Sequence, residues 1–113
     1  MSLQYNSQAN LHVLTWRSDI STQLKIAKLL LLWNLSFSGD ENEDETQEFI
    51  MQLRAFFISI SPETNVRDIF FTLPMIFKRA ALKWYVSQTY AFDSWIAFKE
   101  AFEARFVFKL YDY

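Results

Sequence analysis

The densest set of groups capable of chemistry is an acidic stretch from residue 40 to residue 48. It contains Asp40, Glu41, Glu43, Asp44, Glu45 and Glu48. Paired carboxylates can act as general acid and base, but this work needs rigid placement in different environments. A polar segment beside the single glycine, Gly39, offers no such placement, and the calcium-loop pattern D-x-[DN]-x-[DN]-G does not occur. We therefore expect neither a catalytic pair nor a metal site in this stretch.

The residue types on which most enzyme classes depend are scarce in this chain. It has no cysteine, which excludes disulfides, thiolate zinc sites and cysteine nucleophiles. The one histidine, His12, excludes multi-histidine metal sites, and a triad built on it is disfavoured because it lies in a poorly patterned segment. A single glycine excludes both the P-loop and the dinucleotide-binding fingerprint. The sequence predicts no enzyme, no catalytic residue and no cofactor.

Three basic residues, Lys78, Arg79 and Lys83, form a small cluster that could contact RNA or the acidic stretch of a neighbouring subunit. Nucleic-acid affinity grows with the number of phosphates neutralised, so three charges predict at most weak or indirect binding. The whole chain carries a net charge of −2, whereas the part outside residues 40–48 has an excess of four basic residues. We expect the cluster to be mainly a solvated face.

Length and composition favour one domain with an aromatic core. The chain has 113 residues, of which 51% are hydrophobic and 19% aromatic. The segment from residue 1 to residue 10 lacks the pattern of a signal peptide. The longest apolar run, Leu29 to Trp33, is far shorter than the roughly twenty residues that cross a bilayer. We expect a cytoplasmic protein without a membrane partner.

Apolar residues recur at the helical period in four segments that must form the body of the domain. Their apolar stripes are Phe49, Ile50, Leu53, Phe56, Phe57 and Ile60; Val66, Ile69, Phe70 and Leu73; Phe77, Ala80, Ala81 and Trp84; and Trp95, Phe98, Phe102 and Phe106. Asp44 with Gln47 resembles a capping box for the first of these helices. We expect Pro74 to open the third helix and Asp93 or Ser94 to cap the last.

The region before residue 40 predicts an arm. Residues 1–18 show no sustained period, and Asp19 or Ser21 could then cap a helix that runs to about Leu31, with Leu24, Ala27 and Leu31 on its apolar side. After it, Trp33, Leu35 and Phe37 alternate with polar residues, which places them on one face of an extended segment. They are the candidate partner-binding residues. The alternative, which we favour, is that they pack permanently on the bundle as a covering arm.

The order of these features resembles the amino-terminal lobe of the capsid domain in Ty3/gypsy-type retrotransposon Gag proteins. The similar parts are the run from Trp33 to Gly39, the helix start Glu48-Phe49-Ile50, the run from Arg79 to Tyr85, and the spacing of Trp95, Phe98, Phe102 and Phe106. Their order and spacing agree over residues 33–108. The chain has no cysteine for the nucleic-acid module that often follows in Gag, and no Asp-Ser/Thr-Gly triplet of the aspartic protease.

The resemblance implies an all-α, compact four- to five-helix capsid-lobe-like bundle with an extended N-terminal arm. The expected organisation is an arm with a helix over residues 1–32, the lobe over residues 33–108 and a tail over residues 109–113. The implied function is self-assembly through protein–protein contact, with itself or other Gag-like chains as partners. Two alternatives remain open. One is a domesticated Arc-like adaptor that binds short hydrophobic peptides against residues 33–37, and the other is an RNA-associated particle component.

Overall fold

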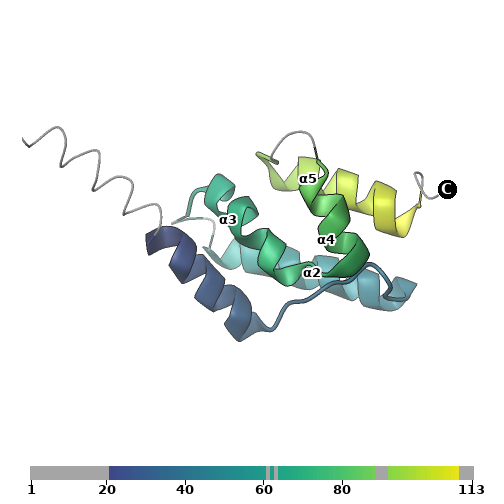
Figure 1. Ribbon diagram of the computed structural model, residues 1–113. Coiled ribbons are helices and arrows are strands. Elements are labelled where there is room, and N and C mark those ends of the chain that lie inside the picture. The colour runs from purple at the N-terminus through teal and green to yellow at the C-terminus, as the bar shows by residue number, and fades with distance from the viewer. Residues whose placement is uncertain (1–20, 61, 63, 89–91, 110–113) are drawn as a thin grey trace, which may run out of the picture.

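The computed structural model describes residues 21–60, 62, 64–88 and 92–109. Within these residues five helices pack together and no strand is formed, so the predicted all-α fold class is confirmed. A helix over residues 21–33 is followed by α2 (Glu43–Ile60), α3 (Val66–Thr72), α4 (Arg79–Val86) and α5 (Trp95–Phe102) (Figure 1). A 3₁₀ turn, η2 (Leu73–Ile76), continues α3, and a π-helical turn, η3 (Glu103–Val107), continues α5. The expected irregular arm over residues 1–18 lies outside the described residues.

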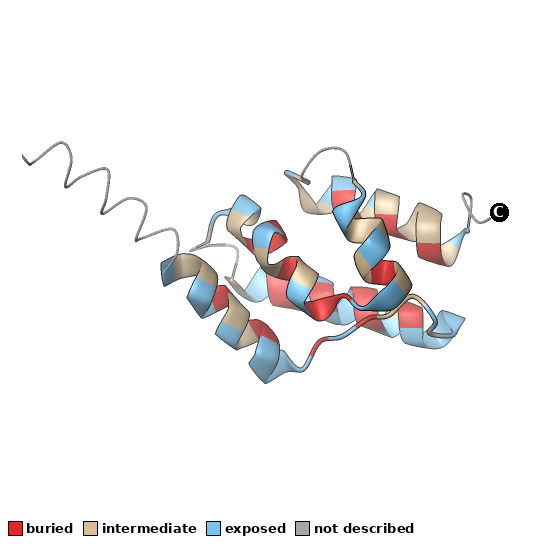
Figure 2. Cartoon of the chain, viewed as in Figure 1, coloured by how far each residue is buried: buried red, intermediate tan, exposed pale blue. Residues whose placement is uncertain are grey.

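Phenylalanine rings fill the centre of the bundle. Phe37 stacks on Phe49 with 4.8 Å between the ring centroids, and it lies 5.0 Å from Phe102 and 5.1 Å from Phe106. The buried parts of the helices face one another across this cluster (Figure 2). The predicted stripes on α2 and α5 are confirmed, because all their members are buried except Ile60 and Trp95, which pack against the core from its edge. Helical period alone was sufficient to find these two faces.

Side chains cap the helices, although one cap differs from the predicted pair. The N–H of Glu45 donates to Asn42 Oδ1 at 2.8 Å, and the N–H of Asn42 donates back to Glu45 Oε1 at 3.0 Å. This reciprocal pair is a capping box, so the predicted pair of Asp44 and Gln47 is wrong by two residues. The acidic first turn of α2 is as predicted, and Ser94 caps α5 by accepting from the Ala97 N–H at 3.1 Å.

Pro74 does not open the third helix, which corrects a second prediction. It lies in η2, the continuation of α3, where a missing N–H is tolerated at the start of a turn. Phe77 is then extended, with φ −94° and ψ 143°, and α4 begins at Arg79. Phe77 therefore enters the core from a joint between helices, whereas Ala81 enters it from α4. The predicted apolar stripe of the third helix therefore combined residues from two different elements.

The helix over residues 21–33 buries a different face from the predicted one. Ile26 and Leu30 are buried, whereas Leu24 and Leu31 are 57% and 68% exposed. Residues four or seven apart lie on one side of a helix, so either pair could form an inner face. Because the end of this helix is an apolar run, a leucine can face the core in several rotations of the helix about its axis. The sequence pattern therefore did not determine which face of the helix is buried.

Candidate protein-contact site

The predicted contact segment begins where the first helix ends. Asn34 adopts φ 57°, and its N–H donates to Leu31 O at 3.1 Å, which ends the helix with the left-handed residue that commonly follows a helix C-terminus. The chain then runs extended to Gly39. Phe37 accepts from the Lys78 N–H at 2.9 Å and donates its own N–H to Ile76 O at 3.0 Å. These bonds form an isolated parallel bridge between Phe37 and Phe77.

The three candidate partner-binding residues do not form one accessible row. Leu35 and Phe37 are 7% and 0% exposed, so both belong to the core. Trp33 lies in the last turn of the preceding helix and is 41% exposed, with its ring at an edge-to-face distance of 5.2 Å from Phe56. The structure therefore places Leu35 and Phe37 in a covering arm, and leaves only Trp33 accessible to a partner.

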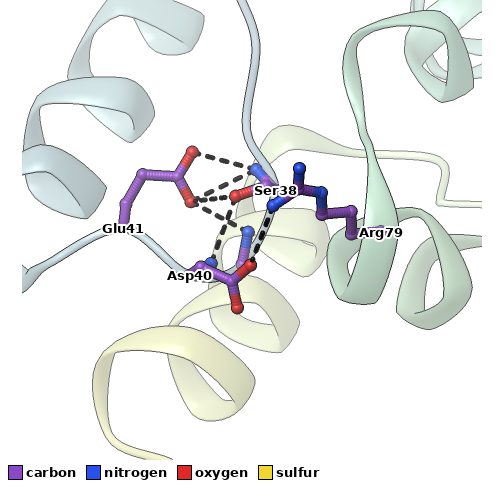
Figure 3. Close-up of polar contacts among 5 residues, drawn as sticks. Ser38, Asp40, Glu41 and Arg79 are labelled. Carbon is purple, nitrogen blue, oxygen red and sulfur yellow. Dashed lines mark hydrogen bonds and ion pairs between the residues drawn. The ribbon is translucent and has the colours of Figure 1, made fainter.

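Glu41 holds the end of this arm in place (Figure 3). Its carboxylate accepts from the Ser38 N–H at 2.9 Å, the Gly39 N–H at 2.9 Å and the Ser38 hydroxyl at 3.0 Å. Burial by itself raises the pKa of Glu41, but these hydrogen bonds outweigh it and hold the pKa below its ordinary value. One member of the acidic stretch thus has a structural task that the sequence pattern did not reveal.

The basic cluster extends along α4, with Lys78 as the N-cap, Arg79 as the first residue and Lys83 in the last turn. Lys78, Arg79 and Lys83 are all exposed, and Arg79 approaches Asp40 at 3.8 Å (Figure 3). Positive charge at a helix N-terminus opposes the helix dipole, so the nearby carboxylate is favourable there. Both side chains of this pair are largely exposed, which limits its contribution to stability. All three residues are exposed, and Arg79 is the one that approaches the acidic stretch of the same chain.

An apolar groove between α3 and α4 was not predicted. It has a volume of about 530 Å³, and its main lining residues are Arg67, Phe70, Phe71, Pro74, Tyr85 and Val86. The Tyr85 hydroxyl donates to Phe70 O at 2.6 Å across the groove, and burial raises the pKa of this hydroxyl above its ordinary value. Phe71 is the residue that sequence reasoning missed. Adjacent rings on a helix can both be buried, as Phe56 and Phe57 are on α2, so the pair of Phe70 and Phe71 did not by itself predict an exposed ring.

Other groups in the described residues give little scope for chemistry. In this part of the chain no group of three or more His, Cys, Asp or Glu side chains is arranged to hold a metal ion. None of the described helices combines the length and apolar character needed to cross a membrane. Trp95 Nε1 is a buried nitrogen for which the described residues provide no acceptor.

Comparison with known proteins adds no relative. No family model matches the chain, and no curated protein or solved structure matches it. The resemblance to a Gag capsid lobe therefore depends on the sequence features given above, and it stays a prediction.

Proposed function

We propose that this chain is a non-enzymatic protein-contact domain that self-assembles in the manner of a retrotransposon Gag capsid amino-terminal lobe. The observation that carries the proposal is the number of large apolar side chains left on the surface of a well-packed helical body. Leu31, Leu32 and Phe71 are 68%, 78% and 72% exposed, and Met51 and Ile96 are 69% and 68% exposed. Exposed apolar side chains that are neighbours on the surface mark protein-interaction sites, and Leu31 and Leu32 are two such neighbours.

The physical basis of such assembly is the covering of apolar surface by further copies. Burial of apolar area contributes about 25 cal/mol per Å², from which the cost of association must be subtracted. Each contact between helix faces is then weak, and a symmetric arrangement multiplies it. The buried arm supports this proposal because its backbone hydrogen bonds to Ile76, Lys78 and Ala81 join the segment after the first helix to the start of α4.

Sedimentation velocity over a wide range of protein concentrations tests self-assembly. We expect the weight-average sedimentation coefficient to rise with concentration and to fall again when salt is raised, if the basic cluster contacts acidic side chains of another copy. Electron microscopy of the associated sample should show particles or regular oligomers. A protein that remains monomeric at millimolar concentration would contradict the proposal, whatever its fold.

The alternative, an Arc-like adaptor for short hydrophobic peptides, is supported by one observation, the open groove between α3 and α4. Its floor and lips are aromatic and aliphatic, as in sites that hold an apolar side chain. A titration with apolar peptides at a protein concentration where the chain is monomeric tests this function. We expect Phe71→Ser to abolish binding, because Phe71 is 72% exposed and can be changed without disturbing the core.

A further inference from the structure

The groove between α3 and α4 is suited to bind an apolar helix face that carries one negative charge. Phe71 and Val86 form its exposed lips, at 72% and 65% exposure, and Tyr85 is fixed in its floor by the bond to Phe70 O. Arg67 is the one charged residue among the lining residues and is exposed at the rim. Among the described residues it forms no ion pair. An apolar surface with a free guanidinium at its edge favours an apolar partner that carries a carboxylate.

The outer face of α2 has the complementary character. Glu48, Met51, Ala55 and Ile58 lie within about 80° of one another around the helix. All are exposed, Met51 to 69% and Ile58 to 60%. The recorded polar contact of the Glu48 carboxylate is a long one, from Gln52 Nε2 at 3.4 Å. This ridge, defined as these four residues, is apolar along its length and acidic at its beginning.

The spacing of the two surfaces also agrees. Arg67 and Pro74 are seven residues apart along α3 and η2, as are Glu48 and Ala55 along α2. At a rise of about 1.5 Å per residue, both distances are close to 10 Å. Glu48 can therefore face Arg67 while Ala55 faces Pro74. The small side chain of Ala55 suits close approach at that end, and Met51 between them reaches the exposed ring of Phe71.

We infer that the α3–α4 groove of one copy receives the α2 ridge of a second copy, with Glu48 paired to Arg67. This inference rests on the proposed self-assembly and specifies its contact. Because each copy presents both surfaces, the contact either builds rings or filaments or closes as a two-fold dimer in which each groove receives the ridge of the other copy. The negative charge and apolar body that the groove requires are both present on this chain, whereas no external peptide is needed to supply them.

Charge reversal tests the pairing on the full chain. Arg67→Glu and Glu48→Arg each replace an attraction by a repulsion, and each should weaken self-association at least about tenfold in sedimentation equilibrium. The double variant should regain association, and so should an equimolar mixture of the two single variants, because every groove then meets a ridge of opposite charge. Lys28→Glu makes the same change in charge as Arg67→Glu on an exposed residue of the first helix and should leave association unchanged.

Two outcomes separate this inference from the function on which it rests. If the wild-type chain does not associate, the proposed self-assembly fails. If it associates but the two charge reversals leave its dissociation constant unchanged, or if the mixture does not regain association, this contact is wrong while self-assembly stands. Phe71→Ser provides a second measure, because removing an exposed aromatic lip should weaken association more than tenfold while the circular dichroism spectrum stays that of the wild type. Wild-type association after Phe71→Ser would also overturn the assignment.

Discussion

Two segments that lie close together in the sequence, residues 31–33 and residues 35–37, place their apolar side chains in opposite environments. Leu31 and Leu32 are 68% and 78% exposed, whereas Leu35 and Phe37 are 7% and 0% exposed. The first group belongs to a helix whose hydrogen bonds are internal, so nothing but packing determines its rotation. Phe37 in the second group is held by backbone bonds to Ile76 and Lys78, some forty positions later. For Phe37, long-range backbone pairing rather than local hydrophobicity determines entry into the core.

The largest loss of stability is expected for a substitution of Phe37, at the centre of the extended segment that covers the core. Phe37→Ala should lower the free energy of unfolding by about 3–5 kcal/mol, because it removes a fully buried ring that contacts Phe49, Phe102 and Phe106. Urea denaturation followed by circular dichroism measures this. Trp33→Ala is the matched control and should cost much less, since that ring is 41% exposed. Equal costs for the two variants would mean that the arm does not enter the core.

Gly39, at the end of this extended segment, should be the next most sensitive position to substitution. Gly39 has φ 96°, and an added Cβ would lie 3.2 Å from Ala81 N and 3.2 Å from Phe106 Cε1. Gly39→Ala should therefore cost about 1–3 kcal/mol through backbone strain and crowding. Asn34→Gly is the control, because glycine accepts the left-handed conformation of Asn34 without strain. A thermal melt that shows no loss for Gly39→Ala would contradict the observed path of the arm.

The loss of stability caused by Glu41→Gln should depend on pH. The charged carboxylate accepts three short bonds from Ser38 and Gly39, and partial exposure limits the loss of stability to about 1 kcal/mol at neutral pH. The pKa of Glu41 is lowered in the folded protein, so its contribution is complete above the ordinary pKa of about 4.3. It disappears as the pH falls through the folded pKa. The difference between wild type and variant should therefore shrink in acid, and a difference that grows there would contradict the assignment.

The predictable parts of the fold are those with a sustained period and no competing pattern. The stripes on α2 and α5 follow from sequence because most of their large apolar residues recur on one face, with Met51, Ile58 and Ile96 as exposed exceptions. The cap of α2 was misplaced because Asn42 with Glu45 and Asp44 with Gln47 are two residues apart and fit similar rules. The position of Phe77 depends on its bridge to Phe37, a contact across the fold that no local pattern contains.

The candidate site was less predictable than the fold. Alternation of apolar and polar residues directed attention to residues 33–37, but it cannot distinguish an arm that covers a core from one that lines a groove. The groove between α3 and α4 arises where two helices separated by a 3₁₀ turn and a bridge come together. No local pattern marked it in the sequence, because the adjacent rings Phe56 and Phe57 on α2 are both buried whereas Phe71 beside Phe70 is exposed.

The smallest loss of stability is expected for substitution of an exposed residue in the helix over residues 21–33. Leu31→Ala should change the free energy of unfolding by no more than about 0.5 kcal/mol, since the side chain is 68% exposed and alanine favours helix. Leu30→Ala, one residue earlier and 0% exposed, should cost about 2–5 kcal/mol. The two variants remove the same atoms from adjacent positions, so the difference between their urea midpoints reports only the rotation of the helix. If Leu31→Ala proves the more costly, the predicted stripe of Leu24, Ala27 and Leu31 faces the core after all, and Ile26 and Leu30 belong to the surface.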